Sequence, residues 1–519
     1  MPTVSLPEQP SYAQLRKQAR ELQRAIRAGA GDALAEAAER HPSGAPSAAD
    51  RAAYSLSSAQ LIVARRYGFA SWARIKHHLE IVERYGRSPA ALDQASASDP
   101  AGEFLRLACL TYEQDAPERR AAAREILGRH PELTGASIHA AAATADVGAL
   151  RALLAGGPGA AARVEGGPYR WEPLLYLAYA RHDLEIARDA VLAAARLLLE
   201  HGADPNAGYL WHGRYPFTAL TGVFGEGERG PVDQPRHPHA PALARLLLEA
   251  GADPDDGQAL YNRMFGSDDD HLELLFEFGL GSTASGVWRA RLDASASPIE
   301  SSAQMLRGQL RWALAHGMVE RVRLLADHGV DIREPFDDGS APVQYAATSG
   351  HRELVALLVS LGADAPDPDQ CPVDSYITAA LAADRAEAAG LQAAHPGVAS
   401  AARAKRPGLV VWAAAQGKPG SVELLVEAGF QVNAKARSDV PRDDRWETAL
   451  HVAAMNGDPD LVRTLLSLGA DPDIRDKRFE ATPLGWARHF GHAEIEGILE
   501  PVTTPEPAEE GGRGLAEEG

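Results

Sequence analysis

One recurring phrase limits the fold of this chain more than any other feature: a leucine-rich stretch followed by Gly, a small residue and Asp. Its clearest copies are residues 197–204 (LLLEHGAD) and 246–253 (LLLEAGAD). Leucines at helical spacing bury one face of a helix, and Gly ends that helix because it adopts the left-handed conformation without a Cβ clash. The Asp then favours a turn. The phrase therefore predicts a helix, its C-terminal cap and a turn, and this unit recurs along the chain.

The spacing of this phrase indicates a repeat architecture. Weaker copies end at Gly279, Gly329, Gly362, Gly429 and Gly469. Gly329 and Gly362 are 33 positions apart, and the next copy follows 67 positions later, about two such periods. A larger spacing, such as the 49 positions between Gly202 and Gly251, indicates an insertion.

A second phrase begins the other helix of each repeat. Its clearest copies are residues 447–457 (ETALHVAAMNG) and 481–487 (ATPLGWA). Thr caps a helix through its hydroxyl group, and Pro fits the first turn, where its missing N–H is not needed. The two phrases together predict pairs of helices joined by turns.

These phrases resemble the ankyrin repeat family, in which T-P-L-H-x-A-A is followed by G-H and then by L-L-x-x-G-A-D. The resemblance implies an all-α ankyrin-repeat solenoid of helix-turn-helix pairs with short finger loops, and about ten repeats with insertions over residues 134–500. It also implies a concave face and finger loops that recognise a partner protein, with no catalytic activity. His139, His351, His451 and His492 occupy positions that hold repeats together in this family.

The rest of the chain divides around this array. We expect an N-terminal helical module at residues 1–87, connecting helices that continue the stack at residues 88–133, and a disordered acidic tail at residues 501–519. The string 64–72 (ARRYGFASW) is similar to an N-terminal motif of many bacterial ankyrin-repeat proteins. The phrase 253–263 (DPDDGQALYNR) is unusual for an ankyrin array and points to the same bacterial subfamily.

Composition excludes several classes of function. The formal net charge of −19 repels phosphate backbones, which argues against nucleic acid as a partner of the whole chain. Cys109 and Cys371 are far apart and fit no metal spacing. No long apolar run predicts a membrane span, and no secretory signal is recognisable. We therefore expect a cytoplasmic monomer with an unidentified protein partner.

No motif in the sequence indicates a catalytic, cofactor-binding or metal-binding residue. Residues 225–230 (GEGERG) match G-x-G-x-x-G, but they lie in a polar insertion rather than between a strand and a helix. Two alternatives stay open. The basic helices at 59–87 point to a nucleic-acid-binding regulator, and the 225–241 insertion, with His237 and His239, to an enzyme or metal protein.

Finger insertions that carry aromatic residues and arginines are the candidate partner-binding segments, since Trp, Tyr and Arg most often anchor interfaces. The alternative is that these aromatic residues pack onto neighbouring fingers. The candidates are Tyr169, Arg170, Trp171, Trp211, Arg214, Tyr215, Arg442, Arg445 and Trp446.

Overall fold

The computed structural model describes residues 4, 6–7, 11–87, 99–155, 161–282, 286–292, 299–367 and 370–505. The chain forms two compact units, Met1–Leu306 and Arg307–Gly519. Most of the segment expected to be a disordered tail, from residue 506 on, lies outside the described residues, as does the start of the expected connecting segment, residues 88–98.

The N-terminal residues of the first unit form a helical module with its own core. Leu15, Ala19, Leu22 and Ile26 form the buried stripe of the first helix, and they pack in one cluster with apolar residues of the later helices. Ser11, Ser55 and Ser71 cap three of the helices by accepting backbone N–H groups. The elements are α1 (Tyr12–Ala28), α2 (Gly31–Arg40), η1 (Arg51–Ala53), α3 (Leu56–Arg66) and α4 (Trp72–Tyr85).

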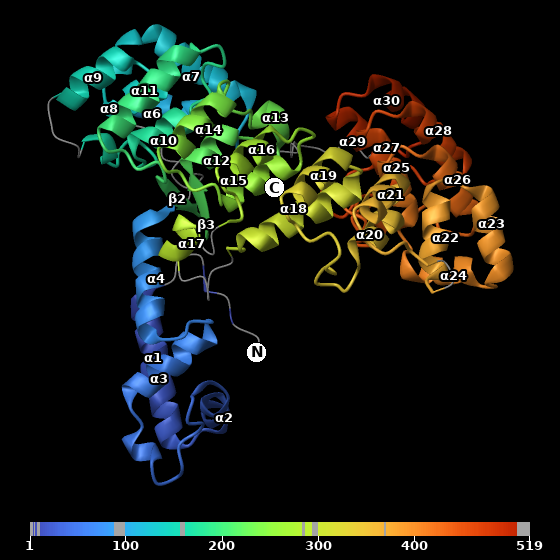
Figure 1. The fold of residues 1–519 in the computed structure, drawn as a ribbon, viewed down its shortest axis with the longest axis horizontal. Coiled ribbons are helices and arrows are strands. Elements are labelled where there is room, and N and C mark those ends of the chain that lie inside the picture. The colour runs from blue at the N-terminus through green and yellow to red at the C-terminus, as the bar shows by residue number, and fades with distance from the viewer. Residues whose placement is uncertain are drawn as a thin grey trace. The chain divides into compact units, whose positions relative to one another are not determined.

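A small sheet joins this module to a finger (Figure 1). Strand β1 (Gly86–Arg87) pairs in parallel with β2 (Gly208–Trp211), which pairs antiparallel with β3 (Tyr215–Thr218). Tyr85 packs edge-on against Trp288, with ring centroids 5.2 Å apart. The repeat phrases contain no signal for this sheet.

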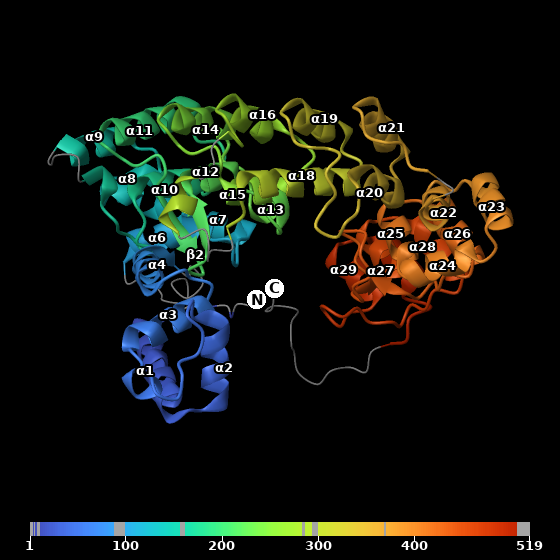
Figure 2. The same ribbon diagram turned by 60° about the horizontal axis from the view of Figure 1, so that its bottom comes forward.

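The remaining helices of the first unit form two rows, one of α8, α10, α12 and α15 and the other of α9, α11, α14 and α16 (Figure 2). The pair α6 and α7 packs before them, and α6 contacts α8. The elements are α6 (Pro100–Ala108), α7 (Pro117–Arg129), η2 (Pro131–Gly135), α8 (Ile138–Ala143), α9 (Val147–Ala155), η3 (Ala161–Arg163), α10 (Pro173–Tyr179), α11 (Arg188–Glu200), α12 (Ala219–Phe224), α13 (Gly230–Asp233), α14 (Ala240–Glu249), α15 (Gly257–Met264), α16 (Asp270–Glu277) and α17 (Val287–Arg291).

The second unit repeats the same helix pairing. Helix α18 (Ser302–His316) begins in the first unit and continues into the second. Inner helices α25, α27 and α29 contact one another in order, as do outer helices α26, α28 and α30, and a large apolar cluster lies among them. The elements are α19 (Val319–Asp327), α20 (Pro342–Ser349), α21 (Arg352–Ser360), α22 (Pro372–Leu381), α23 (Arg385–Ala394), α24 (Val398–Lys405), α25 (Leu409–Ala415), α26 (Pro419–Glu427), β4 (Lys435–Ala436), β5 (Glu447–Thr448), α27 (Ala449–Met455), α28 (Pro459–Ser467), α29 (Pro483–His489) and α30 (Ala493–Leu499).

The helix ends follow the chemistry of the two phrases. Gly202 and Gly251 have φ values of 88° and 97°, in the left-handed region that Gly favours. Thr448 caps α27 in a capping box with His451, and Thr482 accepts a hydrogen bond from the Gly485 N–H at 3.3 Å. None of the described helices is both long enough and apolar enough to cross a membrane.

Candidate functional site

The finger at residues 169–171 packs into the core, so two of its three candidate partner-binding residues, Tyr169 and Trp171, are buried and are not accessible to a partner. Tyr169 is 0% exposed and Trp171 is 1% exposed. Trp171 contacts four aromatic rings, including Tyr209 of the next finger at 5.0 Å, and the Tyr169 hydroxyl donates a hydrogen bond to the Arg106 carbonyl at 2.8 Å. Neighbouring segments cover both side chains, as in the alternative that these aromatic residues pack onto neighbouring fingers. Arg170 is exposed at the tip of this turn, with a positive φ of 54°.

The finger at residues 209–215 is a β-hairpin whose side chains have different exposure. Trp211 is half-buried and stacks on Phe217, with centroids 5.7 Å apart. Arg214 donates to the Leu6 carbonyl at 3.0 Å, so the N-terminal segment already contacts it. Tyr215 stays 40% exposed. This finger therefore offers Tyr215 to a partner more readily than Trp211 or Arg214.

The finger at residues 437–446 in the second unit keeps its candidate residues accessible. Strands β4 and β5 pair at its base. Arg442 and Arg445 are exposed, and Trp446 is half-buried. Two guanidinium groups contact the Trp446 ring, that of Arg437 at 4.0 Å and that of Arg478 at 4.6 Å from its centroid. The two cations hold the indole in one orientation at the surface.

The histidines of the repeat phrases bind backbone carbonyl groups of neighbouring segments, which agrees with a structural role. Burial lowers the pKa of His139 and of His351, and lowers that of His451 to about 4, so these rings stay neutral and donate through one nitrogen. The contacts, all from Nε2 and 2.7–3.0 Å long, are His139 to Val164, His351 to Ala315, His451 to Ala481 and His492 to Met455.

Three arginines of the basic 59–87 segment make contacts within the chain, whereas Arg74, Lys76 and Arg84 are exposed. Arg66 binds both oxygens of Glu36 at 2.7 and 2.8 Å. Arg65 donates to the Arg40 carbonyl at 2.7 Å, and Arg87 is buried and binds Glu165 at 3.1 Å. These guanidinium groups stabilise the module and its sheet, and they are poorly placed to bind phosphates.

The 225–241 insertion packs against the helices rather than forming an open loop. Gln234 donates to buried Asp115 at 3.1 Å, and the fully buried Arg181 donates to the Pro235 carbonyl at 2.7 Å. Burial lowers the pKa of His237 well below its ordinary value, so this ring is neutral. The glycine-rich match follows helix α12, not a strand, which leaves it without the setting of a dinucleotide site.

A potential group of metal ligands lies beside this insertion. One ligand atom each from Asp268, Asp270 and His271 lie within 4.8 Å of one another. Two arginines already bind the carboxylates: Arg236 lies 3.2 Å from Asp268 and 3.0 Å from Asp270, and Arg263 lies 2.5 Å from Asp268. The two guanidinium groups already neutralise these carboxylates and occupy the positions that a metal cation would need.

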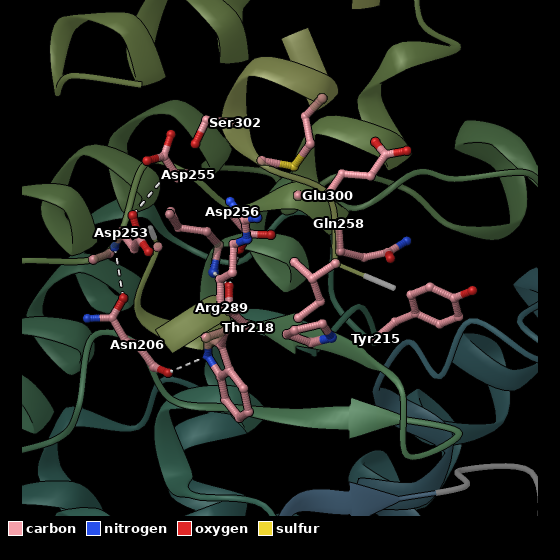
Figure 3. Close-up of a pocket in the computed structure, with 18 of the residues that line it drawn as sticks. Asn206, Tyr215, Thr218, Asp253, Asp255, Asp256, Gln258, Arg289, Glu300 and Ser302 are labelled. Carbon is pink, nitrogen blue, oxygen red and sulfur yellow. Dashed lines mark hydrogen bonds between the residues drawn. The ribbon is translucent and has the colours of Figure 1, made fainter. Parts of the chain in front are cut away.

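A cavity of about 320 Å³ lies where five segments of the first unit meet (Figure 3). Its walls come from the turn after α11, strand β3, the turn after α14 with the start of α15, helix α17, and the start of α18 with the residues just before it. Asp253 and Asp255 lie at the left of the view and Tyr215 at the right, with Glu300 and Gln258 between them (Figure 3). The site is polar on one side and aromatic on the other.

Hydrogen bonds fix the acidic wall of this cavity. Asp253 accepts from the Val287 N–H at 2.5 Å, and its own N–H donates to Asn206 at 2.8 Å. Asp255 accepts from the Gly281 N–H at 2.8 Å.

A neighbouring carboxylate, Asp256, is buried and stabilises the start of a helix. It caps α15 by accepting from the Ala259 N–H at 2.9 Å, and it also accepts from the hydroxyls of Thr218 and Thr221. Burial raises the pKa of Asp256.

The sequence patterns do not predict this cavity, although one unusual phrase contributes to its lining. The acidic wall and Tyr261 belong to the unusual phrase 253–263, while Glu300 and helix α17 follow a poorly patterned stretch. Contacts between segments that are distant in the chain bring them together, and periodicity does not report such contacts.

Comparisons with known proteins identify repeats in the second unit. Residues 307–369 and 403–499 match the family model described as ankyrin repeats (3 copies). The chain is 35% identical to dynein axonemal heavy chain 12 of Bos taurus over 156 residues, which are 29% of this chain and 43% of that protein. It is 27% identical to an L-asparaginase of Dirofilaria immitis over 187 residues, 36% of this chain and 30% of that protein. It is 38% identical to ankyrin repeat and SOCS box protein 14 of Mus musculus over 97 residues, 18% of this chain and 16% of that protein.

The chain spans less than half the length of each of these three relatives. All three are animal proteins, so the bacterial source indicated by residues 64–72 stays a prediction. The matched residues fall on helix pairs of the second unit, including α20 with α21 and α27 with α28. The helical architecture and the matched segments agree: the chain is an all-α solenoid that carries ankyrin repeats.

Proposed function

We propose that this chain is a non-catalytic scaffold that binds a partner protein through its finger segments. Ankyrin repeats support this proposal, because stacked repeats present an extended surface suited to recognition. On this proposal the chain is a cytoplasmic monomer of a bacterial cell that needs no cofactor, and its helix pairs from residue 134 to 500 act as one array of about ten repeats.

The observation that carries the proposal is the finger at residues 437–446. It leaves Arg442 and Arg445 exposed beside Trp446, and these are residue types that anchor interfaces. The contacts of Trp446 with Arg437 and Arg478 orient its indole before binding. Such preorganisation reduces the entropy that an interface loses when it forms.

The two alternatives have weaker support among the described residues. Arg65, Arg66 and Arg87 of the 59–87 segment are engaged with backbone carbonyls, Glu36 and Glu165, so a nucleic acid that used these three arginines would have to break those contacts. The 225–241 insertion is packed against buried Arg181 and Asp115, so it offers a substrate little open surface.

The test is affinity capture with the full chain as bait in extract of its own cells, with bound proteins identified by mass spectrometry. Arg442→Ala combined with Arg445→Ala should lower the recovery of the main partner at least about tenfold, since anchor residues contribute 2 kcal/mol or more. Its matched control is Arg188→Ala combined with Arg196→Ala, which removes two exposed arginines from outer helix α11. Equal recovery with both double variants, or no partner at all, would refute the proposal.

A further inference from the structure

We infer that the cavity between β3, α15 and α17 binds a basic side chain, arginine or lysine, on an extended segment of the partner protein. The inference rests on the proposed function and gives the chemistry of the segment that is recognised. Its evidence comes from the cavity's charge, its fixed carboxylates and its exposed aromatic wall.

The charge of the cavity favours a cation. Asp253, Asp255 and Glu300 line it, and Arg289 is the one basic side chain among its described lining residues. Asp256 is not counted, because it is buried and committed to the cap of α15. Three carboxylates against one guanidinium attract a cationic group and repel an anionic one.

The carboxylates are held in position before a ligand arrives. Asp253 accepts the backbone N–H groups of Val287 and Asp255, and Asp255 accepts that of Gly281. A carboxylate has about four lone-pair sites, so the two N–H groups that Asp253 accepts leave acceptor positions on its oxygens for a second donor. A guanidinium group binds such oxygens in pairs, which adds geometric selection to the charge.

The opposite wall suits the stem of a long basic side chain. Tyr215 is 40% exposed and Tyr261 is 41% exposed, and both line the cavity. Lysine and arginine have an apolar stem and a charged tip, so the stem packs on the phenol rings while the tip reaches the carboxylates. The rings add cation–π attraction.

The size of the cavity sets what it accepts. Its volume of about 320 Å³ lies near the lower end of the roughly 300–1,000 Å³ that is usual for ligand pockets. That volume admits one long side chain with its neighbouring backbone. A folded domain would have to present this side chain on a projecting or extended segment.

The experiment selects peptides from a random library displayed on phage against the immobilised full chain. The peptides that are enriched should share an arginine or lysine, and replacing that residue by glutamine in a synthetic peptide should weaken binding about tenfold or more. No enrichment, or enriched peptides without a common basic residue, would overturn the inference. Free arginine that binds as tightly as the peptide would also overturn it, because the segment would then contribute nothing.

Matched charge variants locate the site. Asp255→Asn combined with Glu300→Gln should weaken binding of the selected peptide about tenfold or more. Glu249→Gln combined with Glu273→Gln also removes two exposed carboxylates, outside the cavity, and should change binding by less than about twofold. Equal effects of the two pairs would place the peptide elsewhere.

Failure of this inference is distinct from failure of the proposed function. If the partner is still captured through Arg442 and Arg445 while no basic peptide is selected, the scaffold function stands and the cavity plays no part in it. If neither a protein nor a peptide binds, both proposals are wrong.

Discussion

Replacing Trp171 by alanine should destabilise the first unit strongly, because this side chain is a centre of its aromatic core. Trp171 is 1% exposed and contacts the rings of Tyr169, Tyr176, Tyr179 and Tyr209 at 4.6–5.4 Å. Aromatic side chains bury roughly 150–250 Å², and at about 25 cal/mol per Å² this corresponds to roughly 4–6 kcal/mol. Large aromatic-to-alanine changes in cores cost about 3–5 kcal/mol, so we expect a loss in that range.

The measurement must report on the first unit by itself, since the chain has two units. Urea unfolding followed by hydrogen exchange and mass spectrometry does so when it is read at peptides from α8 and α10. The control is Tyr215→Ala, which removes an exposed ring from the same unit and should cost less than about 1 kcal/mol. A loss below about 1 kcal/mol for Trp171→Ala, or equal losses for the two variants, would refute the assignment of Trp171 to the core.

Two further predictions concern pH. Burial raises the pKa of Glu172 from 4.5 to about 7, so the folded state holds the proton to a higher pH than the unfolded state. The free energy of unfolding should therefore fall as the pH rises from 4.5 to about 7. Because part of the side chain faces water, Glu172→Gln should gain about 1 kcal/mol at pH 7 in urea unfolding, and a variant that loses stability there would contradict this. Burial lowers the pKa of His451 from 6.5 to about 4, so the unfolded chain takes up the proton first and the second unit should lose up to about 3 kcal/mol as pH falls from 6.5 towards 4. An NMR titration of the His451 ring with a midpoint near 6.5 would refute the second prediction.

The helix pairs were predictable because their signals are local. A leucine stripe ended by Gly202 or Gly251 defines a helix and its cap within a few residues, and Thr448 or Thr482 marks the start of the partner helix in the same way. Leu15, Ala19, Leu22 and Ile26 recur at helical spacing in the same way and form the buried stripe of α1. Such patterns are set by the periodicity of a helix and do not depend on distant segments.

The partner-binding residues were harder to predict because exposure is not a local property. The candidate residues of both fingers are of the types that anchor interfaces. Tyr169 and Trp171 are nevertheless buried, whereas Arg442 and Arg445 are exposed and Trp446 is half-buried. The finger insertions have no periodicity that would separate an anchor residue from a core residue.

Local sequence signals are sufficient to predict an all-α array of capped helix pairs, because each turn and each buried stripe is encoded within one repeat. The tertiary structure sets which side chains those repeats expose. It buried Tyr169 and Trp171 beneath neighbouring fingers and attached strand β1 to the 209–215 hairpin. It also enclosed Asp253, Asp255 and Glu300 with Tyr215 and Tyr261 in one cavity. Each of these outcomes depends on contacts between residues far apart in the chain, and the free energy of such contacts comes from packing and charge that no single repeat contains.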